Sequence, residues 1–297
     1  MTIRDWVTAK LDVWLTPTFD RVQVANGTPA GTSVGAIKTY RYLRVALIIV
    51  IMVPLVSIAI EWLNADLCLE DSISAYYYTP VHSVFVASLV AVGVALIAVK
   101  GATDLEDACL NVAGMLAPVV AFVPTAGESR CGQHVAIAGA YLAKIVDPSS
   151  SPHTRNNMWS LIVGGAIAIV ATLYFSMKET GPRRWQILRW TLVAAAGLAI
   201  VALTFFHSTW VAQRMHFGAA VAMFVAVGVA AIANSCLASN VGQRRYVLQY
   251  RAVAAAMVGG GIAAVLLVPE PHKVLGLEVV ELMCFAAFWM VHSAERW

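Results

Sequence analysis

Long apolar runs dominate the chain and are separated by short polar segments. Runs of about 18 or more apolar residues recur, and none shows the alternation with a period of two that marks a barrel strand. Only helices and closed barrels satisfy their backbone hydrogen bonds inside lipid, so these runs predict an all-α, polytopic membrane bundle. We expect about eight spans, at residues 43–62, 81–99, 106–123, 158–177, 188–206, 215–236, 248–268 and 274–292.

The composition agrees with this pattern and gives it an orientation. Hydrophobic residues make up 60% of the chain and charged residues 12%, about half the share of a soluble domain. With the N-terminus inside, 15 of the 20 Lys and Arg residues fall on the inner side, as the positive-inside rule requires. We therefore expect a multi-pass plasma-membrane protein with both termini in the cytoplasm. The first apolar run starts near Leu43, so no cleavable signal peptide is expected.

The segment before the first span, "MTIRDWVTAKLDVWL", is amphipathic. Its apolar residues recur at helical spacing and include Trp6 and Trp14, and Pro17 ends the pattern. Such a helix either lies on the inner surface of the bilayer or packs on the protein's own cytoplasmic face, where it offers a contact for a membrane-protein partner. Residues 1–36 are thus expected to form this helix and a flexible connector, and residues 37–297 the transmembrane bundle.

Two inner turns share a motif. "GPRRWQILRW" from Gly181 and "GQRRYVLQYR" from Gly242 both place a glycine, two arginines and spaced aromatic residues between apolar spans. One hypothesis is that a helical hairpin is duplicated, as residues 158–206 and 215–268. The other is that any inner turn between membrane helices acquires arginines.

The polar segment "SISAYYYTPVH" lies between the first two spans, on the predicted outer side. Its tyrosines suit an aromatic belt at headgroup level, but three in a row point in different directions, so we expect at least one to face the protein. Its serines suit either a cap for the second span or, less simply, a nucleophile with a histidine base. Together with neighbouring helix ends, the segment predicts an outer polar pocket for a lipid headgroup or small amphiphile, with these candidate ligand-binding residues: Ser72, Ser74, Tyr76, Tyr77, Tyr78, His82, His207, His216, Glu278 and Glu281.

Glu281 is the most suggestive ionisable group, because it lies about two turns inside the last span, where a carboxylate is costly. It is either functional or a protonated or histidine-paired structural acid. His216 and Glu281 are the candidate catalytic residues, although we favour a protein that is not an enzyme and expect no cofactor. Weak candidates for a metal site are His82, His216 and Glu281, but no ligand spacing typical of zinc is present.

Two further outer features concern the loops. Cys68 and Cys131 are the cysteines of the outer loops and are candidates for a disulfide. The long outer loop, 124–157, contains "CGQHVAIAGAYLAKIV", which has the composition of a short helix. On the inner side, "KGATDLED" is expected to be a solvated turn that caps the third span.

The block "SISAYYYTPVHSVFVASLVAVGVALIAVKG" with "DACLNVAGMLAPVVAFVPT" resembles a family of uncharacterised bacterial multi-pass membrane proteins. "HFGAAVAMF" from His216, "RRY" from Arg244 and "EVVELMCFAAFW" from Glu278 are similar to later parts of that pattern. More distantly, the chain looks like the DRAM/Sfk group of six-helix membrane proteins. The resemblance implies a helical bundle, lipid-linked roles and a hairpin additional to six helices, and it implies no activity.

Four hypotheses of function follow. The first is an outer-leaflet pocket that binds membrane lipid, in a sensor or regulator with no nucleic-acid partner. The alternatives are an intramembrane lipid hydrolase or acyltransferase that uses His and Glu, a transporter, and an assembly subunit of a membrane complex. The intramembrane acid and the repeat favour transport, whereas small-residue faces such as "VGGGIAA" favour assembly.

Overall fold

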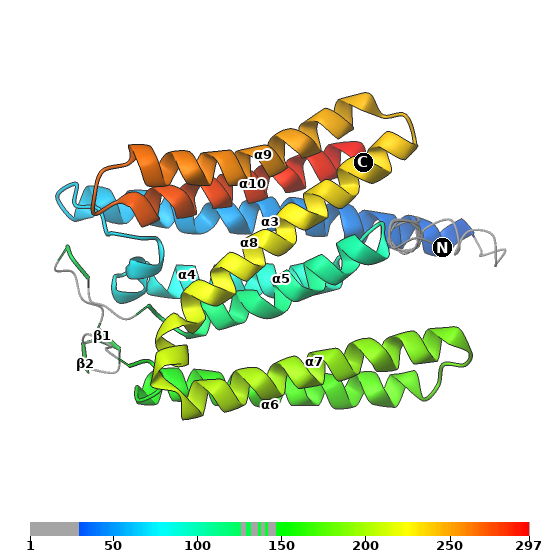
Figure 1. The fold of residues 1–297 in the computed structure, drawn as a ribbon, viewed down its shortest axis with the longest axis horizontal. Helices are drawn as coiled ribbons and strands as arrows, with labels where there is room; N and C mark the ends of the chain where they lie inside the picture. Colours follow the sequence, from blue (N-terminus) through cyan, green and yellow to red (C-terminus); the bar gives the residue numbers. More distant parts are fainter. Residues whose placement is uncertain (1–29, 126–128, 132–135, 138–139, 142–146, 297) are drawn as a thin grey trace, which may run out of the picture.

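The computed structural model describes residues 30–125, 129–131, 136–137, 140–141 and 147–296. This part of the chain is a helical bundle with one short 3-10 helix and a minimal hairpin (Figure 1). The elements, in chain order, are α3 Ala30–Asn64, η1 Ser74–Tyr78, α4 His82–Ala98, α5 Asp104–Phe122, β1 Ala136–Ile137, β2 Ala140–Tyr141, α6 Pro152–Ser176, α7 Pro182–His207, α8 Thr209–Asn240, α9 Arg244–Leu267 and α10 Lys273–Glu295.

The eight long helices correspond to the eight predicted spans. Seven of them are long and apolar enough to cross a membrane, and the eighth, α4, has 17 residues. At 1.5 Å per residue, α4 just reaches the lower limit for crossing the hydrocarbon core. The chain is therefore a multi-pass integral membrane protein with the predicted all-α architecture.

Two predicted boundaries need correction. α3 already begins at Ala30, so residues 30–36, which we expected in a flexible connector, belong to the first helix. α6 begins at Pro152, inside the predicted loop 124–157, because Ser151 caps it and proline suits the first helical turn. The predicted amphipathic helix lies outside the described residues.

The described part of the long loop also differs from expectation. Residues 136–137 and 140–141 pair as two short antiparallel strands, with Ala136 opposite Tyr141. The short helix predicted there is wrong for these residues. Apolar composition alone does not separate helix from strand in a segment of this length.

Six helices form the main bundle, in which α8 crosses between the pair α4/α5 and the group α3/α9/α10 (Figure 1). Large side chains of α10, including Phe285, Phe288 and Trp289, fill the centre against small residues of α8 such as Ala230 and Ala231. α3 begins and α10 ends at the same end of this bundle. We call this end the turn end. We call the opposite end, which carries Cys68 and Cys131, the disulfide end.

α4 is held to α5 by a close backbone crossing of two glycines. A Cβ added to Gly93 would lie 2.8 Å from the carbonyl oxygen of Gly114, and a Cβ on Gly114 would lie 2.7 Å from that of Gly93. Pro118 of α5 also lies against Gly93, at 2.9 Å from the same added atom. In lipid, where apolar burial does not drive helices together, such close packing supplies much of their association.

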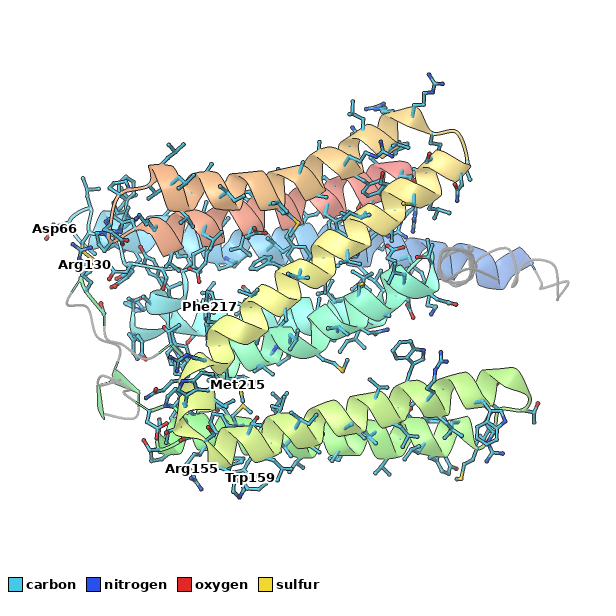
Figure 2. All side chains as sticks on the ribbon, in the orientation of Figure 1. Asp66, Arg130, Arg155, Trp159, Met215 and Phe217 are labelled. Atoms are coloured by element: carbon cyan, nitrogen blue, oxygen red, sulfur yellow. A yellow bond between two sulfur atoms is a disulfide. The ribbon has the colours of Figure 1, made fainter. Side chains whose placement is uncertain are left out.

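The hairpin α6–α7 stands apart from the main bundle over most of its length (Figure 1). It joins the bundle at the disulfide end, where Met158, Phe205 and Ala212 share a small buried cluster. Trp159 stacks on Phe206, with ring centroids 4.8 Å apart. Figure 2 shows Trp159 at this end of the hairpin. The apolar surface along the rest of the hairpin is left for lipid or another chain.

The two arginine-containing turns share one local feature. Gly181 and Gly242 both adopt positive φ, at 69° and 75°, in the turns α6–α7 and α8–α9. A residue with a Cβ is strained there, so each turn requires its glycine. The surroundings differ, because α8–α9 is part of the main bundle and α6–α7 is peripheral. The duplication therefore stays a prediction, supported by turn geometry alone.

Candidate functional site

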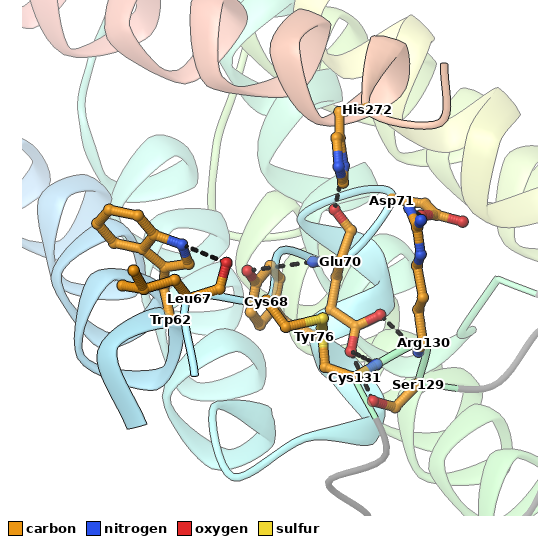
Figure 3. The surroundings of a disulfide bond; sticks show 10 residues. All are labelled: Trp62, Leu67, Cys68, Glu70, Asp71, Tyr76, Ser129, Arg130, Cys131 and His272. Carbon is orange, nitrogen blue, oxygen red and sulfur yellow. Dashed lines mark hydrogen bonds and ion pairs between the residues drawn. A yellow bond between two sulfur atoms is a disulfide. The ribbon is translucent and has the colours of Figure 1, made fainter. Parts of the chain in front are cut away.

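The loops at the disulfide end are tied together. A disulfide joins Cys68 and Cys131, the pair that the sequence singles out (Figure 3). Beside it, the buried carboxylate of Glu70 accepts hydrogen bonds from the Ser129 hydroxyl at 2.5 Å and from the Arg130 backbone N–H at 2.8 Å. The first loop is thereby fixed to the start of the long loop.

This closed loop also reaches the last helix. The backbone N–H of Leu275 donates to the carbonyl oxygen of Asp71 at 3.0 Å, and the Asp71 carboxylate pairs with Arg130 at 3.0 Å. Nδ1 of His272 lies 3.3 Å from the carbonyl oxygen of Glu70 (Figure 3). The loop after α3 is thus positioned between the long loop and the start of α10.

The helix η1 carries the polar segment into the protein. Ser72 accepts a hydrogen bond from the Ala75 backbone N–H at 3.0 Å, while Ile73 occupies the N-cap position of η1. The predicted serine cap of α4 is wrong, since Val81 occupies that position without a side-chain bond. Tyr76, Tyr77 and Tyr78 are each only 1% exposed. The predicted aromatic belt is therefore wrong, and the expectation that at least one tyrosine faces the protein is confirmed, since all three face the core of the disulfide end.

Burial governs the chemistry of these tyrosines. Loss of solvent raises the pKa of the Tyr77 and Tyr78 phenols well above their ordinary range. Tyr78 donates to the carbonyl oxygen of Thr125 at 2.6 Å, whereas the Tyr77 hydroxyl has no hydrogen-bond partner among the described residues. Both therefore serve as neutral side chains, and Tyr77 has a donor to spare.

Three predicted residues from three elements meet beneath η1. The hydroxyl of Ser74 lies 2.7 Å from Nε2 of His216 on α8 and 2.8 Å from Oε1 of Glu278 on α10. The other carboxylate oxygen, Oε2, accepts from the backbone N–H of Ile73 at 2.5 Å. Ser74 and His216 are 4% and 3% exposed, so water does not compete for these bonds.

The partners of the His216 ring define where protons lie in this cluster. Nδ1 lies 2.6 Å from the carbonyl oxygen of Val123, which can only accept, so Nδ1 carries a hydrogen. Nε2 and the Glu278 carboxyl both contact the hydroxyl of Ser74, which has one hydrogen and can donate it to only one of them. The other group must then carry a proton of its own and donate it to Ser74. Either Glu278 donates to Ser74 and Ser74 to Nε2, or the order is reversed. The three side chains form a relay for one proton.

An apolar cavity of about 60 Å³ extends from this cluster into the bundle. Ser74 and Glu278 bound it at one end, and Ser88 adds a hydroxyl. The other walls are apolar and come from five helices and from Ile73 before η1; they include Val50, Ile51, Pro54, Phe85, Leu89, Val92, Ala220, Met223, Phe224 and Phe285. Val92 lies about 15 Å along α4 from its first residue, so the cavity reaches toward the middle of the membrane.

The remaining predicted residues lie elsewhere. Nδ1 of His82 lies 2.7 Å from the Tyr77 carbonyl oxygen, and its ring contacts Tyr77 and His153. His207 is exposed at the end of α7, where Nδ1 lies 3.0 Å from the Leu203 carbonyl oxygen. Neither residue belongs to the Ser74 cluster.

The pairing of Glu281 with His216 is not found. Glu281 Oε1 lies against Gly261 of α9, and its buried Oε2 has no partner among the described residues. Glu278, one turn earlier, takes the predicted place. In the described ranges no three His, Cys, Asp or Glu side chains gather as a metal would need, so His82, His216 and Glu281 do not form a common site.

A second buried polar cluster, at the turn end, was not foreseen. Glu106 of α5 is fully buried, with Oε1 2.9 Å from Nε2 of His292 on α10 and Oε2 2.7 Å from the Ala102 backbone N–H. Arg296 lies 3.8 Å from the same carboxylate and donates to Asn234 of α8 at 2.6 Å. The expected solvated turn is therefore wrong for Glu106.

The sequence held a signal for this cluster. Thr103 and Glu106 have the spacing of a capping box, and the Thr103 hydroxyl accepts from the Glu106 backbone N–H at 3.1 Å. A capping glutamate normally stays at the surface. Only the packing of α10 over this turn buries it, and that packing is a tertiary effect.

Comparisons with protein-family models, with curated proteins and with solved structures find no match to this chain. The resemblance seen in the sequence therefore stays an expectation.

Proposed function

We propose that this membrane protein binds a small amphiphile at the disulfide end, as a sensor or regulator. The observation that supports this proposal is a cavity that is apolar along its length and is bounded at one end by Ser74 and Glu278. Drug-sized ligands occupy pockets of about 300–1,000 Å³, so about 60 Å³ suits only part of a single hydrocarbon chain. The ligand is then a single-chain amphiphile with a small polar head, such as a hydroxyl or an amine.

The Ser74 cluster suits such a head. A hydroxyl or amine of the ligand can replace one hydrogen-bond partner within the relay without leaving a buried polar atom unsatisfied, whereas an apolar group cannot. The relay shifts its one proton toward Glu278 or toward His216, so it accepts either a donor or an acceptor. Binding at this place would change the contacts that join η1, α8 and α10 through Ser74, His216 and Glu278.

We also propose that the disulfide end faces the outside and the turn end the cytoplasm. The support is the bias of Lys and Arg toward the turns and termini, together with a disulfide, which persists in oxidising compartments. Figure 2 shows Asp66 and Arg130 at the disulfide end of the main bundle and Arg155 at the same end of the hairpin α6–α7. The polar head would then lie at the depth of the outer leaflet of the plasma membrane.

The test is lipid analysis of the purified protein by mass spectrometry. We expect the wild-type chain to retain one single-chain amphiphile, and Ser74→Ala and the cavity-filling Ala220→Phe to lose it. Ser83→Ala is the matched control, because Ser83 is an exposed serine at the same end of α4. Retention of the same compounds by all four proteins would refute the proposal.

A second candidate, acyl transfer or hydrolysis, rests on the contact between Ser74 and His216. A serine 2.7 Å from an imidazole nitrogen whose partner nitrogen is fixed has the geometry of a nucleophile with its base. It ranks second because Glu278 Oε1, 2.8 Å from the same oxygen, would repel the negative charge of a tetrahedral intermediate unless protonated. A fluorophosphonate probe that labels wild type but not Ser74→Ala would favour it, and no labelling would remove it.

A further inference from the structure

A basic hollow of about 540 Å³ lies at the turn end, between the last turn of α8 and the start of α9. Its walls are Ser239 and Gly242 on one side and four residues of α9 on the other: Arg244, Val247, Leu248 and Arg251. These four are at i, i+3, i+4 and i+7, which places them on one face of the helix. Two arginines therefore flank two apolar side chains.

Contacts within the protein fix the shape of the hollow. Arg251 donates from Nε to the Ser235 hydroxyl at 3.2 Å, so α8 fixes the guanidinium, and its terminal nitrogens have no other partner in the described part of the chain. Gly242, at φ 75°, makes the sharp turn that brings Ser239 opposite Arg244.

The charges of the hollow are not neutralised by the protein. No carboxylate in the described ranges pairs with Arg244, Arg245 or Arg251. Two acids at the turn end have other partners: Asp107 pairs with Lys100 at 2.6 Å, and Glu295 accepts from Tyr250 at 2.6 Å. An external anion is therefore the natural counter-charge.

We propose that this hollow binds the phosphate of an anionic phospholipid. Arginine forks match phosphate oxygens with paired hydrogen bonds, and Ser239 adds a hydroxyl donor. Val247 and Leu248 between the arginines, with Leu248 71% exposed, suit the glycerol and upper acyl carbons of a lipid rather than a free ion. The site is independent of the Ser74 cavity and lies at the other end of the bundle.

The turn α6–α7 supplies a matched control. It has Arg184 and Arg189 after its own positive-φ glycine, at the same end of the molecule, but it also carries an acid, Glu179. Replacing both arginines by glutamine in either turn removes the same charge. A generic attraction of basic turns to anionic lipid would respond equally to both changes.

The experiment uses the full chain in nanodiscs of phosphatidylcholine with a minority of phosphatidylglycerol, and native mass spectrometry counts the retained phosphatidylglycerol. We expect Arg244→Gln/Arg251→Gln to weaken retention by about fivefold for each arginine removed, and Arg184→Gln/Arg189→Gln to leave it within twofold, on the scale of about 1 kcal/mol per basic residue. Equal loss in both variants, or loss in neither, overturns the proposal.

Two further arms complete the test. Arg244→Lys/Arg251→Lys keeps the charge and loses the fork, so we expect partial retention, and this variant stands in should the glutamine variant fail to fold. In detergent without lipid, inorganic phosphate should not raise the melting temperature of the wild-type protein. A rise that Arg244→Gln/Arg251→Gln abolishes would assign the site to free phosphate and overturn the lipid assignment.

Discussion

The buried pair of Glu106 and His292 offers the sharpest stability prediction. Both side chains are 0% exposed, and Oε1 of Glu106 lies 2.9 Å from Nε2 of His292. Removing one partner leaves the other buried without its counter-group, which costs about 3–5 kcal/mol for a buried ion pair. We therefore expect His292→Ala to lower the free energy of unfolding by about that amount.

Variants of Glu106 should differ from each other in a defined order. Glu106→Ala loses the same contact and also the hydrogen bond that the Ala102 N–H donates to Glu106 at 2.7 Å, which adds about 0.5–1.5 kcal/mol. Glu106→Gln keeps an acceptor for that N–H while losing the charge. We expect Glu106→Ala to be the most destabilised of the three variants and Glu106→Gln to be less so.

The assay is equilibrium unfolding of the purified protein by SDS titration in mixed micelles. Lys100→Ala is the control, because it breaks the exposed ion pair with Asp107 at the same end, which is worth less than about 1 kcal/mol. The reasoning fails if His292→Ala costs no more than Lys100→Ala, or if Glu106→Gln costs as much as Glu106→Ala.

Three other predictions concern packing, the loop bond and pH. Gly93→Ala should destabilise by at least about 1–3 kcal/mol through overpacking against α5, while Gly259→Ala, where an added Cβ meets nothing within 4 Å, should be neutral in the same titration. Cys68→Ser should cost about 4 kcal/mol, because it opens a loop with a sequence separation of 63; an unchanged unfolding midpoint would contradict this. Burial raises the pKa of Tyr77 and Tyr78, so the folded state holds their protons more tightly and stability should fall as pH rises above about 10, the unfolded value. Replacing both by Phe should reduce that fall, and identical pH slopes would refute the assignment.

The pattern of apolar runs was sufficient for the architecture, because lipid imposes helices on any long apolar segment. The helix ends were less predictable. α3 extends back to Ala30 and α6 to Pro152 because helices continue beyond the membrane where capping and backbone allow it, and hydropathy does not report that extension.

The candidate site was predictable as a set of residues and not as a geometry. The histidine and the serine were identified from the polar segment and the start of α8, but the acid was assigned to Glu281 when Glu278 makes the contact. The two glutamates are about 60° and 4.5 Å apart on one helix, and only the packing of α10 against η1 distinguishes them. Tyr77 and its neighbours were misplaced for the same reason, since η1 folds inward.

The direct test of the central claim is photo-crosslinking with a single-chain amphiphile that carries a diazirine in its tail. If the cavity below Ser74 binds such a ligand, the label should map by mass spectrometry to cavity-lining residues near Val92 on α4 and Met223 on α8, and Ala220→Phe should abolish that labelling. Labelling spread over the lipid-facing surfaces of the bundle, with none at the cavity and no effect of Ala220→Phe, would contradict the account.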